Sequence, residues 1–389
     1  MAKNERAGRT ALRLDGPELA RQGQSWADLL ARDRAASPFL SRSVLGASRA
    51  GGLVPAATRF LVAVGEDGRW RALLPFRPAR VGLGRRRALA AWASIYGPDS
   101  RPLLDGDDRE GAADALLAAM ARDGPLWLLP QWQPDSAPGR AVAQALIRRG
   151  GAATPLAAYR RPILRRRPSV GAWEAEIRPE RLRDLARRER GLAKLGAVSH
   201  EVATEAADRP AALADFLSLE AAGWKGRRGT ALASRPGART YAEALFGAEG
   251  GDVGIRIDRP VLEGRTIAAS LALVARGTAY LLKTAYDESL ARFAPGLLLE
   301  RAIIRACHET GFADALDTTA EEETGPFAEL YPDRMTVVDL LLSPDGAIGL
   351  DELARIAESE LQRRLLRNRA VGLYWAARDR LATLRGGAG

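Results

Sequence analysis

The stretch from Leu262 to Leu299 is the most informative part of this sequence. It holds two apolar runs, Thr266-Ile-Ala-Ala-Ser-Leu-Ala-Leu-Val274 and Thr278-Ala-Tyr-Leu-Leu-Lys-Thr-Ala-Tyr286, joined by Ala275-Arg276-Gly277. Two such runs around a short turn that contains Gly predict a β-hairpin. The segment Asp287-Glu-Ser-Leu-Ala-Arg-Phe-Ala-Pro-Gly296 follows and leads into a helical run. The stretch therefore predicts a hairpin whose second strand leads through a loop into a helix.

The beginning of that helix has the composition of an anion site. Pro295 and Gly296 fall where the first helical residues should be. Proline is tolerated there because its missing N–H would have no partner, and glycine lets a ligand approach the backbone. The unpaired N–H groups and the positive end of the helix dipole favour an anion. Arg292, just before the helix, adds a full positive charge.

Three blocks of the chain resemble one family. Lys283-Thr-Ala-Tyr-Asp-Glu288 with Phe293-Ala-Pro-Gly-Leu-Leu298 is similar to the pattern before the cofactor-binding helix in the CelD-like branch of the GNAT acyltransferase superfamily. The blocks Glu220-Ala-Ala-Gly-Trp-Lys-Gly-Arg-Arg-Gly-Thr230 and Asp317-Thr-Thr319, the latter followed by an aromatic-bearing segment through Tyr331, resemble the same branch. Together they cover roughly residues 170–345 in the family's order. The resemblance implies an acyl-CoA thioester as donor and an amine as acceptor.

The resemblance also implies the fold. It predicts an α/β (α+β) protein of two tandem GNAT-like domains with mixed central sheets, related to the Fem-type transferases, plus a C-terminal helical segment. A chain of 389 residues is long enough for two domains. The charged, Pro-bearing segment Arg165-Arg-Arg-Pro-Ser169 marks the expected boundary. We therefore expect domains at residues 1–165 and 166–345, the second carrying the acyl-donor site, and helices at 346–389.

Helical and strand patterns alternate through both expected domains. Helices are expected at 26–33, 108–122, 139–149, 180–194, 209–221, 239–247, 296–310 and 325–331, and strands at 60–64, 70–76, 126–129, 157–164, 197–204, 253–258, 313–318 and 335–342, besides the central hairpin. After Gly346 the chain is expected to be helical to Leu384, with Leu353, Ala357, Leu361 and Leu365 on one face.

Charge and cysteine content limit the environment and the partners. The chain has 58 basic and 48 acidic residues, a net charge of +10. This excess favours anionic partners such as CoA phosphates or an anionic membrane surface, with DNA less favoured. Cys307 is the only cysteine, so no internal disulfide can form, and no apolar run reaches the length of a membrane-spanning helix. We expect a cytoplasmic protein, with peripheral contact to the inner membrane as a further hypothesis.

Acyl transfer to an amine needs a deprotonated amine, a polarised carbonyl and a protonated leaving thiolate. Asp287 follows a strand beside the expected donor loop, where it could accept the ammonium proton or cap the loop. Lys283 shares a strand face with Leu281 and is expected to pair with Asp317 or Asp287, or to hold a substrate anion. The resemblance assigns Tyr331 as a candidate proton donor to the leaving sulfur.

The remaining candidate residues divide by role. Donor-binding candidates are Arg292, Phe293, Pro295, Gly296 and Leu297, and acceptor-binding candidates are Trp224, Lys225, Tyr286 and Asp317. Cys307 lies inside an expected helix, which favours a buried residue over a nucleophile. His200 and His308 have no metal-ligand spacing with another His or Cys, so no metal is expected.

One expected helix has a basic face. Arg183, Arg187, Arg190 and Lys194 recur at helical spacing. The face is either a solvated stripe or a surface for an anionic acceptor or lipid headgroups. In the second case we expect Tyr374 and Trp375, in the C-terminal helix, to contact the membrane together with it.

The resemblance leaves several functions open. Our first hypothesis is an acyl-CoA-dependent N-acyltransferase that acts on a primary amine. The amine could be long-chain and sphingoid-like, as in ceramide-type lipid synthesis, or an envelope or polysaccharide precursor. The alternatives are a Fem-like transferase that uses an aminoacyl-tRNA donor and a non-catalytic regulatory protein that keeps the GNAT fold.

Overall fold

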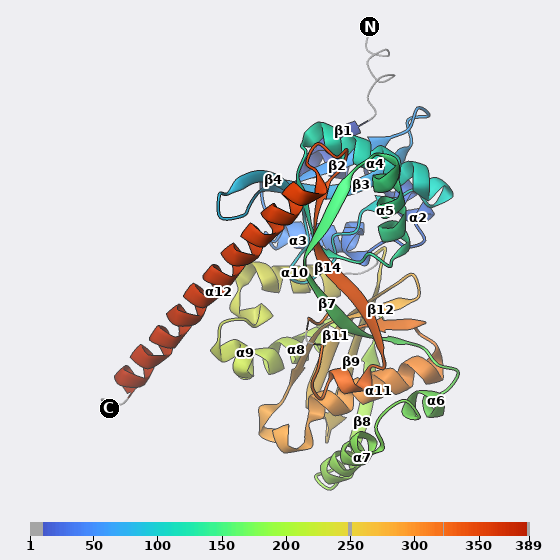
Figure 1. The fold of residues 1–389 in the computed structure, drawn as a ribbon. Helices are drawn as coiled ribbons and strands as arrows, with labels where there is room; N and C mark the ends of the chain where they lie inside the picture. The colour runs from blue at the N-terminus through green and yellow to red at the C-terminus, as the bar shows by residue number, and fades with distance from the viewer. Residues whose placement is uncertain (1–10, 248–250, 322, 387–389) are drawn as a thin grey trace.

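The structure is a computed structural model that describes residues 11–247, 251–321 and 323–386, with side chains described up to Val371. A twisted sheet runs through the molecule, and one long helix projects from it (Figure 1). Residues 11–165 are called the N-terminal half below, and residues 166–345 the C-terminal half.

Strands and helices alternate in both halves. The N-terminal half contains β1 (Ala11–Leu14), α1 (Gly16–Arg21), α2 (Gly23–Arg32), α3 (Arg42–Ala50), β2 (Arg59–Val64), β3 (Trp70–Val81), β4 (Arg86–Ala91), β5 (Leu103–Leu104), α4 (Arg109–Asp123), β6 (Trp127–Trp132), α5 (Ala137–Arg148) and β7 (Ala152–Arg165). The C-terminal half contains α6 (Val170–Glu174), α7 (Pro179–Ala193), β8 (Val198–Ala203), α8 (Arg209–Ala222), α9 (Trp224–Arg227), α10 (Pro236–Phe246), β9 (Gly254–Leu262), β10 (Arg265–Thr266), β11 (Ala268–Ala275), β12 (Thr278–Tyr286), α11 (Pro295–Thr310), β13 (Ala315–Asp317) and β14 (Asp333–Ser343), and α12 (Leu350–Gly386) ends the chain.

Two long strands join the halves. β14, from the C-terminal half, lies between β6 and β7 and is antiparallel to both. β7 in turn pairs with β13. The described residues therefore form one sheet of 14 strands, in the order β1-β2-β3-β4-β6-β14-β7-β13-β12-β11-β9-β10 with β5 and β8 off this path. The predicted α/β class is confirmed, although one continuous sheet replaces the two expected ones. The domain boundary at residue 165 stays a prediction.

The central hairpin is buried on both faces. Along β11, Leu271 and Leu273 pack in a cluster with α8 and α10, whereas Ala268 and Ala272 pack against α11. A strand covered by helices on both faces has an almost continuous apolar sequence rather than an alternating one. This explains why the run from residue 266 to 274 contains so few polar residues.

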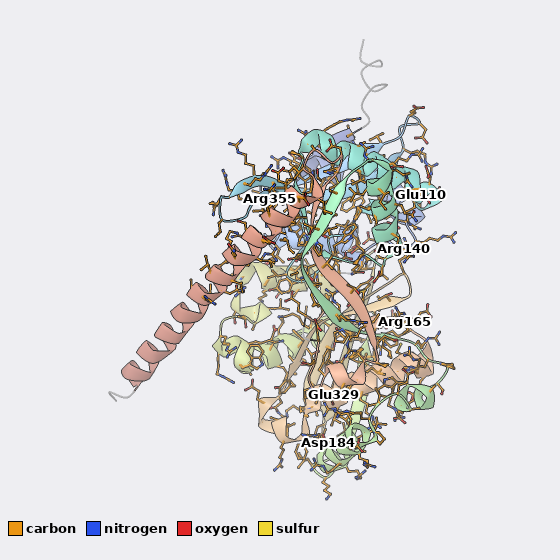
Figure 2. The ribbon with its side chains drawn as sticks, in the orientation of Figure 1. Glu110, Arg140, Arg165, Asp184, Glu329 and Arg355 are labelled. Carbon is orange, nitrogen blue, oxygen red and sulfur yellow. The ribbon has the colours of Figure 1, made fainter. Side chains whose placement is uncertain are left out.

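The last helix leaves the body of the protein after its first turns. Leu353 and Ala357 pack against strands of both halves, as expected from their spacing. Leu361 and Leu365, on the same expected face, are 37% and 59% exposed. Figure 2 places Arg355 where α12 still lies against the N-terminal half, and the rest of the helix extends away. The long helix expected after Gly346 is confirmed and places these four residues on one face, but only the first two of them are buried.

One of the expected helices needs correction. The short helix predicted at 325–331 is only a 3-10 turn, Ala328–Leu330. Tyr331 follows this turn and lies in extended backbone.

Candidate functional site

Two parallel strands diverge in the C-terminal half. β12 and β13 pair only through Thr278 with Ala315, Ala279 with Leu316, and Tyr280 with Asp317. Beyond these pairs, the hydroxyl of Thr319 donates to the Leu281 carbonyl at 2.7 Å. The other edge of β12 stays paired with β11 as far as Tyr286. Within the described part of the chain, residues 282–286 thus have a strand on one edge only, which opens the sheet at this point.

The loop after β12 leads to the N-terminus of α11. It contains a 3-10 turn, Glu288–Phe293, and Ala294 in the left-handed conformation at φ 50°. No side chain caps the N-terminus of α11. Arg188 of α7 donates to the Arg292 carbonyl at 2.8 Å and fixes the loop.

The predicted donor-binding residues lie together in this loop. The guanidinium carbon of Arg292 stands 4.5 Å from the centre of the Phe293 ring. Pro295 and Gly296 begin the helix, and a Cβ added at Gly296 would lie 3.3 Å from the Tyr286 ring. Leu297 is half-buried in the core beside α11. An uncapped helix N-terminus beside an arginine is suited to an anion, and the small residue at 296 leaves the backbone accessible.

A cleft of about 610 Å³ lies between the C-terminal end of β12 and helix α8. Tyr286, Asp287 and Glu288 line one part of it, and Asp215 of α8 lines another. Trp224 and Lys225 line a small recess that adjoins it and also contains Tyr286 and Glu288. We call these two connected spaces the β12 cleft. It brings the predicted Asp287, Trp224, Lys225 and Tyr286 together.

Asp287 is held by three bonds. Its carboxylate accepts from the Ser289 amide at 2.9 Å and the Ser289 hydroxyl at 2.6 Å, and pairs with Arg265 at 2.5 Å. Partial burial raises the pKa of Asp287, but the bonds from Ser289 and Arg265 outweigh it and hold the pKa below its ordinary value. The carboxylate is therefore ionised at neutral pH. It caps the loop, and it can accept a proton only as a weak base.

Glu288 connects the loop to α9. It accepts from the Trp224 amide at 2.5 Å and from Arg227 at 2.6 Å. The bond from Arg227 and then that from the Trp224 amide hold the pKa of Glu288 below its ordinary value. This bridge fixes Trp224 at the entrance of the recess.

The partner of Lys283 is Glu220, which corrects the expected pairing with Asp317 or Asp287. The Lys283 ammonium lies 2.8 Å from the fully buried Glu220 carboxylate, and the Lys225 ammonium lies 3.7 Å from the same oxygen. Lys225 also donates to the Thr284 carbonyl at 2.9 Å. Burial and then the neighbouring Lys283 lower the pKa of Lys225, while Glu220 opposes this. One buried acid thus holds two lysines at the end of the cleft.

Tyr331 lies away from the cleft. Its side chain is 1% exposed, packs in the core beside α11, and donates its hydroxyl to Glu300. Burial and the nearby Glu300 raise the pKa of Tyr331 well above its ordinary value, and burial raises the pKa of Glu300 to about 7. A hydroxyl enclosed in this way has no path to a leaving sulfur in the described structure. The position argues against the role that the resemblance assigned to Tyr331.

Asp317 belongs to a buried network between the halves. Arg161 of β7 pairs with Asp317 at 3.3 Å and donates to the Tyr159 hydroxyl at 2.8 Å. Asp317 also accepts from the Thr319 amide at 2.8 Å, as a cap of the following segment. Sequence reasoning missed Arg161 because its partner is distant in the chain and its strand shows no period that marks it as buried.

The other expectations concern chemistry outside the cleft. Cys307 is buried, and burial raises the pKa of its thiol to about 11, which is unfavourable for a nucleophile. In the described ranges, no group of three or more His, Cys, Asp or Glu side chains could hold a metal ion. No helix among the described residues is both long and apolar enough to cross a membrane.

Part of the predicted basic face is neutralised within its own helix. Arg183 pairs with Glu180 at 2.8 Å and Arg187 with Asp184 at 2.5 Å. The side chains of Tyr374 and Trp375 lie outside the described residues. Membrane contact through these residues stays a prediction, and two of its four cations already have partners.

Comparison with known proteins identifies the C-terminal half. Residues 179–324 match the acetyltransferase (GNAT) domain family. A search of curated proteins found no match.

Several solved structures are similar to most of this chain, and one of them has a TM-score above 0.5. The C-terminal DUF2156 domain of a protein assigned as lysylphosphatidylglycerol synthetase, from Agrobacterium fabrum, is 14% identical, with a TM-score of 0.51 over 83% of this chain and 92% of that one. FemX is 12% identical, with a TM-score of 0.49 over 81% and 95% of the two chains. A tandem GNAT protein from the clavulanic acid biosynthesis pathway is 15% identical, with a TM-score of 0.42 over 86% and 98%. The diverging strands, the loop and the uncapped helix all lie within residues 179–324, the segment that matches the acetyltransferase (GNAT) domain family.

Proposed function

We propose that this protein is an N-acyltransferase that moves an acyl group from an acyl-CoA thioester to a primary amine. The observation that supports it most is the divergence of β12 and β13 next to the uncapped N-terminus of α11. The two features give one extended substrate two kinds of contact. The unpaired backbone groups on the strand edges can hydrogen-bond the amide groups of the acyl-CoA donor. The N-terminus of α11 can bind the phosphates of the same donor.

The residues around the opening fit the phosphate end of such a donor. Arg292 has no carboxylate partner among the described residues, so its charge is available to a phosphate. Gly296 lets the Tyr286 ring pack closely against the first turn of α11, where a Cβ would lie 3.3 Å from that ring. The thioester supplies the electrophilic carbonyl carbon. The protein positions the donor and supplies the positive charge that binds its phosphates.

The β12 cleft is the proposed acceptor side. Asp215, Asp287 and Glu288 line it, and each of these carboxylates also bonds an arginine. An ammonium group would share the carboxylates with these arginines. The neutral amine attacks the thioester carbonyl carbon, a C–N bond forms and the C–S bond breaks. The amine loses a proton, for which Asp287 or water is the acceptor, and the thiolate gains one. Since Tyr331 is enclosed, we assign the second proton to solvent.

Donor class is tested by direct assay of the full chain. Purified protein is incubated with acetyl-CoA or a long-chain acyl-CoA and with either a sugar amine or a long-chain amine. Free thiol is then measured, and the acylated amine is identified by mass spectrometry. Amine-dependent thiol release supports the proposal. Transfer from an aminoacyl-tRNA with no reaction from any CoA ester would overturn it, and so would the absence of turnover with every donor.

A further inference from the structure

A large cavity lies far along the sheet from the β12 cleft, in the N-terminal half. It has a volume of about 740 Å³ and lies between β3, β4, the end of α4 and α12. An adjoining space of about 460 Å³ continues it along α12 and shares Arg77, Arg80 and Arg363. We call the two spaces the arginine groove. Nothing in the proposed acyl transfer uses it.

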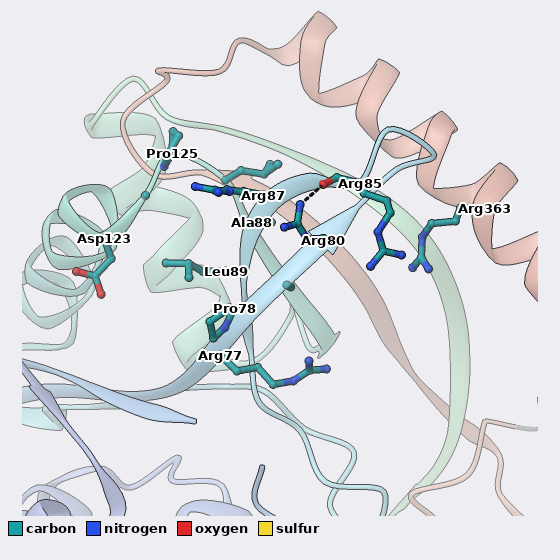
Figure 3. Close-up of a pocket in the computed structure, with 13 residues that line it drawn as sticks. Arg77, Pro78, Arg80, Arg85, Arg87, Ala88, Leu89, Asp123, Pro125 and Arg363 are labelled. Atoms are coloured by element: carbon teal, nitrogen blue, oxygen red, sulfur yellow. Dashed lines mark hydrogen bonds between the residues drawn. The ribbon is translucent and has the colours of Figure 1, made fainter. Parts of the chain in front are cut away.

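Arginines line three sides of this groove. Arg77 and Arg80 come from β3, Arg85 and Arg87 from the β3–β4 hairpin, and Arg363 from α12. Figure 3 shows Arg80, Arg85 and Arg363 around the space between the hairpin and the helix. The first four side chains are all exposed. Such an arrangement concentrates positive charge in a concave surface, which strengthens the local field.

Most of these charges have no anionic partner. Among the described residues, Arg77, Arg85 and Arg87 have no carboxylate contact, and Arg80 donates only to the Arg85 carbonyl, at 3.1 Å. Three acids also line the groove, and each bonds an arginine: Asp123 bonds Arg13, Asp339 bonds Arg364, and Glu360 bonds Arg363 and Arg364. Because the arginines outnumber these acids, the groove keeps a net positive charge.

The groove is held in shape by a buried acid. Glu360 is 1% exposed, bonds Arg363 through both oxygens at 2.7 and 2.6 Å, and accepts from the Gly82 amide at 2.7 Å. The Leu83 amide donates to Ser359 at 2.9 Å. These bonds fix the hairpin turn on α12, so the arginines of the turn and of the helix keep their relative positions.

The turn also contains backbone strain at one of the arginines. Arg85 has φ 51°, in the left-handed region that side-chain-bearing residues rarely adopt. Strain of this kind persists where the surrounding structure imposes it, and it is frequent at ligand sites. The left-handed conformation of Arg85 is imposed by three hydrogen bonds of the turn. Two run from the Gly82 and Leu83 amides to α12, and one runs from Arg80 to the Arg85 carbonyl.

The floor of the groove is apolar. Pro78, Ala88, Leu89, Pro125 and Leu126 line it between the arginines. A flat organic group can pack on such a surface while its charged groups meet guanidinium forks, which bind phosphate in bidentate fashion. Because the arginines come from three elements, a ligand with more than one phosphate satisfies them better than a single phosphate does.

We propose that the arginine groove binds an organic di- or triphosphate of nucleotide size. The site is separate from the acyl-donor site, and it does not depend on the proposed acyl transfer. The probes are ATP, ADP, AMP, adenosine and inorganic pyrophosphate, and binding to the full chain is measured by calorimetry at fixed salt. ADP and ATP should bind, AMP should bind more weakly, and adenosine alone should not bind measurably.

Variants locate the binding. Arg85→Gln and Arg87→Gln should each weaken ADP binding by roughly 10-fold or more, the loss expected for a charge-assisted contact. Arg85→Lys should restore only part of the affinity, because lysine keeps the charge and loses the planar fork. Thermal melting of each variant checks that it folds.

A matched control removes the same charge elsewhere. Arg239 and Arg305 are exposed and pair with Glu243 and Glu309 on their own helices. The variant Arg239→Gln/Arg305→Gln should bind ADP within about twofold of wild type, whereas Arg85→Gln/Arg87→Gln should not bind it measurably. Equal losses in both double variants would overturn the proposal in favour of non-specific attraction. Failure of every small phosphate to bind, with binding of an RNA duplex or of anionic vesicles, would also overturn it.

Discussion

In the β12 cleft Arg227 and Arg265 each bond a carboxylate, whereas in the arginine groove Arg77, Arg85 and Arg87 bond none among the described residues. The main space of the cleft measures about 610 Å³ and that of the groove about 740 Å³, with a second space of about 460 Å³ in the groove. Both regions can hold a small ligand, and the clearer difference between them is in charge. Charges that are paired internally fix loops and side chains in place. Charges without partners remain available to a ligand from outside. We therefore expect variants in the cleft to change chemistry and stability, and variants in the groove to change anion binding.

The largest expected effect is on turnover in the cleft. Asp287→Asn keeps the shape of the side chain and can still cap Ser289, but an amide cannot accept the ammonium proton. Turnover should fall by about 10²–10⁴, the usual loss when a general base is removed. Steady-state kinetics at saturating acceptor measures it.

The control variant is Arg265→Gln, which leaves the Asp287 carboxylate but removes its cation. Loss of the cation should raise the pKa of Asp287, so the acidic limb of the pH–rate profile should move to higher pH while turnover is kept. Near wild-type turnover in Asp287→Asn would mean that this residue only caps the loop.

The second effect is on stability. Glu220→Gln would leave Lys225 and Lys283 without their shared anion in a buried site. Removing one partner of a buried ion pair destabilises a protein by about 3–5 kcal/mol. Urea unfolding should show this loss. Glu288→Gln, which breaks an exposed pair with Arg227, should unfold at nearly the wild-type urea concentration. If the two variants were equally stable, the buried charges of the cleft would be structurally unimportant.

A third prediction separates two buried acids. Glu220 has two lysines beside it, whereas the side chain that bonds Glu300 among the described residues is the neutral Tyr331 hydroxyl. Burial raises the pKa of Glu300 from 4.5 to about 7, so the folded state binds more protons than the unfolded state between these values. Stability from this group is therefore present at pH 4.5 and is lost as the pH rises through 7, by up to about 3 kcal/mol.

Glu300→Gln should abolish that loss, since an amide does not titrate and can still accept from Tyr331. Urea unfolding of wild type and variant at pH 5 and pH 8 gives the difference. A variant whose stability fell between the two pH values as much as the wild type's would show that Glu300 does not titrate there.

The fourth effect concerns donor binding. Arg292 resembles the arginines of the groove, because it too has no carboxylate partner among the described residues. Arg292→Ala should weaken binding of a CoA ester by about 2 kcal/mol, the value for a hydrogen bond to a charged group. Calorimetry measures it, and Arg305→Ala in α11 is the control. An unchanged affinity would place the donor phosphates elsewhere.

The smallest expected effect is a gain in the stability of the folded protein. Arg85→Gly should relieve the left-handed strain and stabilise the protein by about 0.5–1 kcal/mol, net of the entropy cost of glycine. The same change should weaken ADP binding by roughly 10-fold or more, as Arg85→Gln does. Arg276→Gly is a matched control, because Arg276 also has φ 51° but lies outside the groove. Loss of ADP binding in both variants would contradict the assignment of the site to Arg85.

Local patterns predicted the elements around the site well. Helix 296–310 was expected from Pro295, Gly296 and the spacing of its apolar residues, and α11 spans Pro295–Thr310. The hairpin was expected from two apolar runs around Arg276 and Gly277, and β11 and β12 match it. These features depend on neighbours in the sequence, so the sequence carries them directly.

Contacts between distant residues could not be predicted in the same way. Nothing in the periodicity of 335–342 shows that β14 lies between β6 and β7, because strand pairing is set by the whole sheet. Lys283 was correctly expected to need an anion, but Glu220 lies on another element, and the choice among several acids depends on packing. The strand β4 was missed because Arg86 and Arg87 hide its alternation, and the groove was missed with it.

The placement of β14 has a consequence for biosynthesis. When residue 165 has been translated, β7 has no partner strand yet, since both β13 and β14 come later, and β6 still lacks its second neighbour. A ribosome adds roughly 5–20 residues per second, so the exposed edges of β6 and β7 wait on the order of ten seconds or more. During that interval the nascent chain displays two open sheet edges, which are sites of aggregation. Folding of residues 11–165 is thus completed only after β14 has been translated, and nascent chains stalled before residue 333 should depend strongly on chaperones.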